Sequence, residues 1–289
     1  MFMHEAETLQ RPREFEISER DFEFISEFIG TRTGIVLGEN KQEMIYGRMA
    51  RRLRALKMTT FAEYRQLLES PDGAGELPEM INALTTNLTK FFRENHHFQH
   101  LGSEVLSRAF KRTRIGRARI RIWSAGCSSG QEPFSIALTI ADNVPDFQRH
   151  DIKILATDLD SNMVARGRSG RYSSSDIESI RPALRDRWLR PVDGEESIYI
   201  FDDSIRAMIT FNTLNLLNEW PVRGPFDAIF LRNVIIYFDN DLQRKIIGRI
   251  YDLLDDSGFL YLGHSENISR MSDQFANFGK TIHSKISQD

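Results

Sequence analysis

The sequence contains a single cysteine, Cys127, among 289 residues. One cysteine excludes an internal disulfide, and the sequence has no cysteine and histidine cluster with the spacing of a zinc site. A reducing compartment, the cytoplasm, is therefore expected. Long apolar runs are also missing: no stretch reaches the roughly 18 apolar residues that a spanning helix needs. The first 16 residues, MFMHEAETLQRPREFE, lack the apolar core of a signal peptide, so we expect no membrane insertion.

The chain also lacks a large net charge of either sign. The chain has 38 basic and 41 acidic side chains, a net charge of −3, so no strong overall attraction to nucleic acid or membrane is expected. Apolar residues make up 40% of the chain and charged residues 27%, which is typical of an ordinary globular protein. The length allows one large domain or two modest ones of roughly 150 residues each.

The first part of the chain has the pattern of helices. Apolar residues recur there at helical spacing, which predicts an all-helical domain over 15–75. A flexible N-terminus is expected over 1–14. The turn residues Ser-Pro-Asp-Gly at 70–73 indicate that the helical domain ends nearby, and we place a linker at 76–86.

From Arg119 onward, short apolar strands alternate with amphipathic helices. The predicted strands are RIRIWSAG (119–126), IKILATDL (152–159), FDAIFLRN (226–233) and GFLYLGH (258–264). This alternation indicates βαβ units on a mainly parallel sheet. The block 196–214 interrupts it with two β-like runs. We expect a two-strand excursion there, with the second run, 208–214, joining the main sheet.

A glycine turn follows the first predicted strand, in WSAGCSSGQEP (123–133). Gly126 and Gly130 let the backbone approach a ligand, and the helix that follows offers free N–H groups. Their spacing is neither that of a dinucleotide-binding motif nor that of a P-loop. Asp158 ends the next strand, where a carboxylate can accept hydrogen bonds from ribose hydroxyls. These features favour a nucleoside cofactor without a phosphate chain, such as S-adenosylmethionine; tight loop packing with Asp158 as a helix cap is the alternative.

The segment LTTNLTKFFRENHHF (84–98) combines polar, aromatic and charged residues. Adjacent histidines point to different faces of a helix, so His96 and His97 are poor joint metal ligands and no metal is expected. The segment strongly resembles the signature of the chemotaxis receptor glutamate O-methyltransferases, the CheR type. Further blocks match that family in order: WSAGCSSGQEPFSIAL (123–138), ATDLD (156–160), NTLNL (212–216), FLRNVIIYFD (230–239) and LGHSEN (262–267). The resemblance covers about residues 15–285.

The resemblance implies both a fold and an activity. The fold is α/β: a class I S-adenosylmethionine-dependent methyltransferase domain, Rossmann-like with a mainly parallel sheet, over 87–289. A small all-helical N-terminal domain precedes it, and a small antiparallel β-subdomain is inserted at about 190–211. The implied activity is methylation of glutamate side chains in cytoplasmic chemoreceptor domains. It yields glutamate 5-O-methyl esters and S-adenosyl-L-homocysteine, as part of chemotaxis adaptation.

Site residues are also implied by the resemblance. Asn87, Thr89 and Arg93 would reach the methionine end of the cofactor. Asp158 would hold the ribose, and Asn215 would line the adenine site. The full set expected at the cofactor is Asn87, Thr89, Arg93, Gly126, Glu132, Asp158, Asn215, Leu216, Arg232 and Asn233.

The implied chemistry needs no general base, because a glutamate carboxylate is already ionised at neutral pH. Catalysis is expected to come from in-line positioning and from removal of water from the carboxylate. We expect Arg93 and Tyr237 to orient the two reactants. Arg93 can pair with a carboxylate through two N–H groups, and Tyr237 can make one hydrogen bond.

Arginines crowd the second predicted helix. Arg48, Arg51 and Arg52 share one face, and Arg54 lies nearby. From the residues alone, a solvated face is the usual explanation. The resemblance instead implies that this helix docks on the glutamate-rich helical bundle of a methyl-accepting chemoreceptor. Some family members also grip a receptor C-terminal peptide with a glycine-rich loop, but RPVDGEESIYIF (190–201) has one glycine and three acidic residues, so we expect no such tether.

Two alternative functions stay open. A second basic run, 108–121, holds seven Lys or Arg and no acidic residue, which would suit a nucleic-acid methyltransferase. No recognisable RNA-binding module accompanies it, so we expect no nucleic-acid partner. The other alternative is a non-catalytic module that senses the cofactor and binds receptors. Base lability of the transferred methyl group separates an ester from an N-methyl product. Cofactor binding without methyl transfer would indicate the sensing module.

Overall fold

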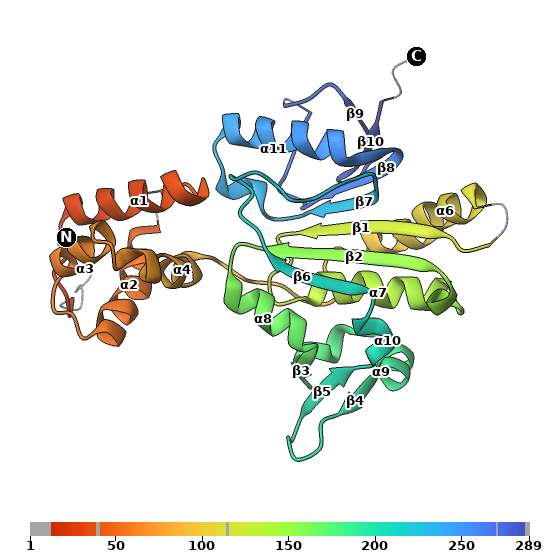
Figure 1. The fold of residues 1–289 in the computed structure, drawn as a ribbon, viewed down its shortest axis with the longest axis horizontal. Helices are drawn as coiled ribbons and strands as arrows, with labels where there is room; N and C mark the ends of the chain where they lie inside the picture. Colours follow the sequence, from red (N-terminus) through yellow and green to blue (C-terminus); the bar gives the residue numbers. More distant parts are fainter. Residues whose placement is uncertain (1–12, 39–40, 114–115, 270, 287–289) are drawn as a thin grey trace, which may run out of the picture. The chain divides into compact units, whose positions relative to one another are not determined.

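The structure of the protein, a computed structural model, describes residues 13–38, 41–113, 116–269 and 271–286. The chain divides into two units (Figure 1): residues 1–30 with 37–84, and residues 31–36 with 85–289. The flexible N-terminus predicted over 1–14 lies almost entirely outside the described residues.

The described part of the first unit is helical, as predicted. Its helices are α1 Glu19–Thr33, whose last turn belongs to the second unit, α2 Gln42–Leu56, α3 Phe61–Glu69 and α4 Gly73–Leu84. Capping residues mark where helices begin. The Asp21 N–H donates to Ser18 Oγ at 3.2 Å, and the Ser18 N–H donates to Asp21 Oδ2 at 3.1 Å. This reciprocal capping box satisfies two backbone donors that the helix itself leaves without partners.

Helix α4 occupies most of the segment predicted as a linker. Its residue Glu76 is buried, and the carboxylate accepts hydrogen bonds from Arg52 Nε at 2.9 Å and from the Tyr64 hydroxyl at 2.8 Å. Gly73 and Pro78 resemble a chain break, but packing of α4 against α2 and α3 overrides this weak local preference. The structure therefore places the end of the helical unit after Leu84.

A seven-stranded sheet forms the centre of the second unit, in the order β6-β2-β1-β7-β8-β10-β9. Strands β6, β2, β1, β7 and β8 are parallel, and β10 and β9 add antiparallel pairs at one edge. The bounds are β1 Arg119–Ala125, β2 Asp151–Asp158, β6 Ile209–Thr213, β7 Phe226–Leu231, β8 Leu254–Leu262, β9 Phe275–Asn277 and β10 Ile282–Lys285. The predicted mainly parallel sheet is confirmed.

Both faces of this sheet are buried. In β1, Ile120 and Ile122 belong to one core cluster, which includes residues of α7, whereas Trp123 and Ala125 belong to a second cluster, which includes residues of α11. Burial on both faces explains why the strands are continuously apolar in the sequence. Figure 1 shows α11 beside β7 and β8, with α7 and α8 on the side of β2 and β6. The helices are α7 Gln131–Asn143, α8 Ser161–Ser169 and α11 Asn240–Leu253.

Shorter helical pieces connect these elements. A helical segment before β1 comprises α5 His96–His100, a π-helical turn at Leu101–Leu106 and α6 Ser107–Arg112. The remaining pieces are η3 Phe147–Arg149, η4 Asp176–Ser179, α9 Pro182–Trp188, α10 Asp203–Arg206 and η5 Ile235–Tyr237.

A small antiparallel sheet is inserted in the second unit, as the resemblance implied. It consists of β3 Arg171–Ser173, β5 Ile198–Phe201 and β4 Leu189–Pro191, in that order. It begins before the expected range of 190–211, because the three-residue strand β3 is too short to show alternation in the sequence. It ends before residue 211 because β6 pairs in parallel with β2 in the main sheet. The prediction that the second β-like run joins the main sheet is therefore confirmed.

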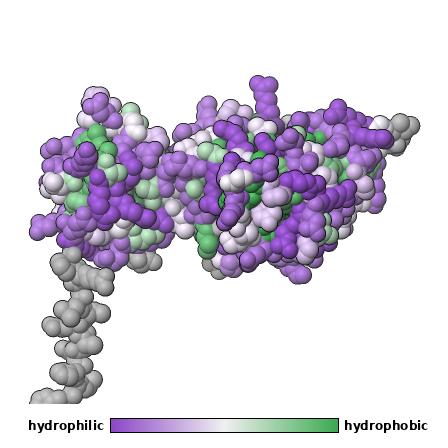
Figure 2. Space-filling model, turned by 90° about the horizontal axis from the view of Figure 1, so that it is seen from below, coloured by the Kyte–Doolittle hydropathy of each residue, from purple (hydrophilic) through white to green (hydrophobic). Residues whose placement is uncertain are grey.

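The surface carries no extended apolar region on the face drawn in Figure 2, where hydrophilic residues dominate and apolar ones form small patches. Among the residues that the structure describes, the exposed large apolar side chains are Val36, Leu88, Ile236, Phe278 and Ile286. Within the described residues, none of the helices combines the length and apolar character that crossing a membrane requires.

Candidate functional site

The predicted site residues of the second unit gather where the parallel strands β1, β2 and β7 end. Parallel strands bring their carboxyl ends to the same edge of a sheet, and ligands of such folds bind there. Three loops meet at this edge: 126–130 after β1, 158–160 after β2 and 232–238 after β7. The segment 85–95 lies against them through Asn87 and Arg93.

The glycine turn after β1 has the left-handed backbone that glycine favours. Gly126 has φ +85° and Gly130 has φ +96°. A Cβ on Gly126 would lie 2.2 Å from Val234 Cγ2, and one on Gly130 would lie 2.5 Å from the Tyr172 hydroxyl. Both positions therefore require glycine for conformation and for space. Cys127, between them, is buried, and burial raises its pKa well above the usual thiol value, as suits a small neutral residue.

Asp158, predicted to hold a ribose, ends β2 facing this turn. Its Oδ2 accepts the Ser128 N–H at 2.7 Å, and its Oδ1 accepts the Asp160 N–H at 2.9 Å. Burial raises the pKa of Asp158 to about 6, although these backbone hydrogen bonds favour the ionised form. Each carboxylate oxygen can accept more than one hydrogen bond, so Asp158 keeps acceptor capacity for hydroxyl groups of a ligand.

Asp160 is a second carboxylate of this edge, and it was not among the predicted site residues. It is 1% exposed, and its Oδ2 accepts hydrogen bonds from Asn87 Nδ2 at 2.7 Å and from Thr85 Oγ1 at 2.9 Å. Its Oδ1 accepts two backbone N–H groups at the start of α8. Asn87 is thus tied to the loop after β2, and its carbonyl oxygen accepts a hydrogen bond from Ser128 Oγ.

Arg232 links two carboxylates under these loops. The side chain of Arg232 is 2% exposed, and its Nη1 donates to Glu132 Oε2 at 2.9 Å. Its Nη2 lies 3.5 Å from Glu94 Oε1 and donates to the Arg93 carbonyl. Burial raises the pKa of Glu132. Burial opposes ionisation of Glu94 most strongly of any single cause, but Arg232, His264 and His97 together outweigh it, and the pKa of Glu94 is lowered.

The other predicted residues lie in the same unit. Arg93 is half-buried and its Nη1 donates to the Leu88 carbonyl at 3.0 Å. Thr89, also half-buried, belongs to the same loop. Leu216 is 8% exposed and packs in the core cluster beside α11. None of the contacts of these three residues by itself assigns a ligand.

Asn215 and Tyr237 are held by the segment 31–36. Asn215 Nδ2 donates to the Arg32 carbonyl at 2.7 Å, and its Oδ1 accepts the Leu217 N–H at 2.9 Å. The Tyr237 carbonyl accepts the Val36 N–H at 2.8 Å. The segment 31–36 therefore holds Asn215, which the resemblance places at the cofactor, and Tyr237, which is expected to orient a reactant. Local sequence patterns do not show this connection.

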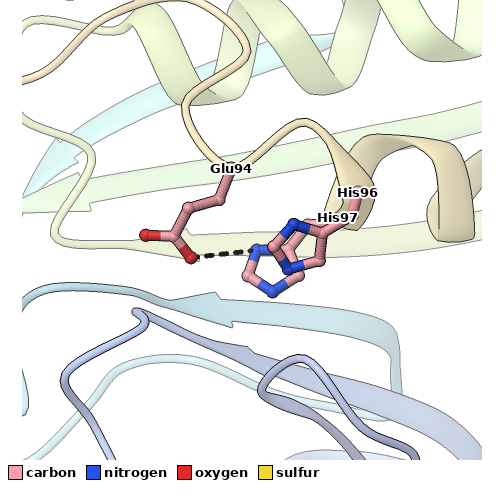
Figure 3. Close-up of side chains that lie close together, drawn as sticks. All are labelled: Glu94, His96 and His97. Carbon is pink, nitrogen blue, oxygen red and sulfur yellow. Dashed lines mark ion pairs between the residues drawn. The ribbon is translucent and has the colours of Figure 1, made fainter.

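Glu94, His96 and His97 lie close together, with possible ligand atoms within 4.8 Å of one another (Figure 3). The spacing predicts that the histidines point apart, but they are the first two residues of α5 and their ring centroids are 4.1 Å apart. Both Nε2 atoms lie 3.0 Å from the Lys280 carbonyl, an acceptor, so we assign the proton to Nε2 in each ring. Burial lowers the pKa of His97 to about 3. The Arg232 cation beside Glu94 disfavours a divalent ion, and we assign this cluster a structural role.

Comparisons with known proteins agree with this geometry. A family model described as "CheR methyltransferase, SAM binding domain" matches residues 87–283, and one described as "CheR methyltransferase, all-alpha domain" matches residues 20–85. The chain belongs to the CheR methyltransferase family. A "Probable chemotaxis protein methyltransferase" of Rhizobium etli is 46% identical over 253 residues, which cover 86% of this chain and 94% of that protein. The "Chemotaxis protein methyltransferase" of Escherichia coli K12 is 39% identical over 97% of this chain and 96% of its own.

Membership in the CheR family makes the protein an S-adenosylmethionine-dependent methyltransferase, and the residues at the edge fit that cofactor. Arg232 Nε and Glu94 Oε2 are buried and have no hydrogen-bond partner among the described residues. Two carboxylates face one guanidinium, Arg232, which leaves a local excess of negative charge suited to a positively charged sulfonium. Asp158 would accept ribose hydroxyls. When bound, the cofactor supplies an activated methyl group.

We expect the affinity of the protein for S-adenosylhomocysteine to fall as the pH is lowered through about 6, where Asp158 titrates. Protonation removes the negative charge and one acceptor that ribose hydroxyls would use. Calorimetric titration at pH values on either side of that pKa measures the effect. Asp158→Asn should bind weakly throughout and lose the dependence. Asp151→Asn, at the other end of β2, should keep it. A wild-type affinity that does not change with pH would contradict this role of Asp158.

Proposed function

We propose that this CheR-family protein methylates glutamate side chains of cytoplasmic chemoreceptor domains, forming 5-O-methyl esters, in chemotaxis adaptation. The observation that carries the proposal is the match of both units, 20–85 and 87–283, to the two CheR domains. Relatives at 46% and 39% identity, covering most of the chain, are named as chemotaxis protein methyltransferases. The second unit alone carries the edge of the sheet at which we expect the cofactor. The helical unit is therefore available to bind the substrate, which supports a protein as the methyl acceptor.

The reaction needs little from acid–base groups. The acceptor carboxylate is ionised at neutral pH, so its oxygen takes the methyl carbon as the C–O bond forms and the S–C bond breaks, with no proton transferred. Orientation and exclusion of water are then the main sources of rate. The Arg93 guanidinium has five N–H donors. One N–H group on Nη1 donates to the Leu88 carbonyl, so the others can contact a ligand. In this proposal, Arg93 and Tyr237 orient the two reactants.

Docking through helix α2 would rest mainly on Arg51 and Arg54, which are exposed. Arg54 pairs with Glu14 on the surface at 3.0 Å, and such exposed pairs exchange readily for other partners. Arg52, predicted with them, instead makes two hydrogen bonds to the buried carboxylate of Glu76. Arg48 donates to the Leu84 carbonyl. The arginine face that we propose for docking is therefore narrower than the sequence predicts.

The basic run 108–121 supports a nucleic-acid acceptor less than its composition implies, because several of its cations pair within the fold. Pairs with a carboxylate are Arg108–Glu104 at 3.8 Å, Arg112–Asp227 at 2.6 Å and Arg121–Asp151 at 2.6 Å. Arg117 Nη2 also donates to the His150 carbonyl at 3.2 Å. A surface whose charges are already paired offers less attraction to phosphates.

Transfer of a labelled methyl group to membranes that contain chemoreceptors tests the proposed activity. We expect label in the receptor, and its release as methanol on alkaline treatment, because an ester is cleaved by base and an N-methyl group is not. Arg93→Ala and Tyr237→Phe should each lower the turnover while the folded state persists. Stable label after alkaline treatment, or cofactor binding without any transfer, would contradict the proposal.

Docking through charge makes a second prediction. With receptor as the varied substrate, we expect the KM to rise with salt while kcat changes little, because salt screens attraction during encounter. The variant Arg51→Glu with Arg54→Glu should raise the KM at low salt and remove most of its salt dependence. Lys245→Glu, an exposed charge reversal on α11, is the matched control and should behave as wild type. A salt-independent KM in the wild type would exclude the docking role.

A further inference from the structure

One buried carboxylate outside the predicted site residues receives an unusual number of backbone donors. Glu266 follows β8 and is 4% exposed. Its two oxygens accept four backbone N–H groups, from Gly263 at 2.6 Å, Asn233 at 2.8 Å, Val234 at 2.8 Å and Ile235 at 3.0 Å. Three of these donors are consecutive in the loop 232–238, so this loop wraps around the carboxylate.

The backbone of that loop needs such an anion. Asn233 has φ +59°, a left-handed conformation that few residues other than glycine and asparagine adopt. Successive N–H groups that point to one place form a concave donor site for an anion. The loop then enters the short turn η5, which ends at Tyr237. A carboxylate at this place therefore determines the path of the chain between Arg232 and Tyr237.

Close packing on both sides transmits this position to the neighbouring loops. A Cβ on Gly263 would lie 2.4 Å from Asn233 Nδ2, and a Cβ on Gly126 would lie 2.2 Å from Val234 Cγ2. The loop after β7 is thus enclosed between the glycine turn after β1 and the loop after β8. A shift of this loop would move Arg232 relative to Glu132, to which it donates at 2.9 Å.

We propose that Glu266 is a positioning residue of the methyltransferase: its carboxylate holds loop 232–238 so that Arg232 stands at the cofactor and Tyr237 at the acceptor. Both oxygens must accept, because the four donors divide equally between them. A carboxamide of the same shape replaces one acceptor oxygen with an NH2 group. The two backbone N–H groups that donate to the replaced oxygen would lose their hydrogen bonds and would face the donor N–H groups of the amide. The Tyr237 part of this inference rests on the proposed function, whereas the Arg232 part needs only cofactor binding.

Glu266→Gln tests the inference, with Asp227→Asn as the matched control. Asp227 is also a buried carboxylate, 6% exposed, and accepts the Arg121 N–H at 2.7 Å and Arg112 Nη2 at 2.6 Å. It lies at the opposite end of β7 from the loop. We expect both variants to lower the Tm. Only Glu266→Gln should weaken binding of S-adenosylhomocysteine, by about tenfold or more, as loss of two charge-assisted hydrogen bonds predicts.

Two further readouts separate positioning from stability. Amide hydrogen exchange at 233–235 in the ligand-free protein should accelerate in Glu266→Gln and not in Asp227→Asn. Glu266→Asp keeps the charge and should recover part of the affinity for S-adenosylhomocysteine. If Glu266→Gln does not fold, the affinity of Glu266→Asp, expected between that of Asp227→Asn and a loss of about tenfold, tests the inference in its place. Affinity within about twofold of wild type, or an equal loss in Asp227→Asn, would overturn the inference. The binding measurement with S-adenosylhomocysteine involves no methyl-accepting substrate. Its result is therefore independent of whether glutamate is the methylated group.

Discussion

Buried carboxylates that accept backbone N–H groups hold the loops at the carboxyl edge of the sheet. A loop that is withdrawn from water must find partners for its backbone donors, and an ionised carboxylate can accept several at once. Asp158 holds the turn after β1, and Glu266 holds the loop after β7. Two of the residues that donate to them, Ser128 and Asn233, have left-handed backbone with φ +48° and +59°. The carboxylates thus stabilise conformations that the chain alone disfavours.

The electrostatics of the site follow from the same arrangement. Burial raises the pKa of Asp158, Glu132 and Glu266, so these charges persist only where donors face them. Arg232 balances Glu132 and Glu94 together and leaves the edge with an excess of negative charge. A sulfonium cofactor complements that excess, and a carboxylate acceptor needs no base. The chemistry we propose therefore depends on how the loops are held more than on any group that transfers a proton.

Local patterns in the sequence predict most of the fold. The alternation of apolar strands and helices predicts the mainly parallel sheet, and the β-like run at 208–214 joins that sheet as expected. Contacts distant in sequence were not predictable. Asp160 binds Asn87 across 73 residues, and Glu266 binds its loop across 31 to 33. The sequence assigns Arg52 to the partner surface from its place on the arginine face. It does not reveal the pairing with Glu76, because Glu76 falls where the sequence resembles a linker. The resemblance to the family names Arg232, Asn233 and Glu132, but not Glu266, whose carboxylate accepts the Asn233 N–H.

The central claim is that this carboxylate-held edge is where the cofactor binds. A crystal structure of the protein with S-adenosylhomocysteine tests it most directly. The account predicts density at the ends of β1, β2 and β7, with both ribose hydroxyls within hydrogen-bond distance of Asp158 and with Arg232 still paired to Glu132. Density elsewhere on the protein, or a ribose that does not contact Asp158, would contradict it.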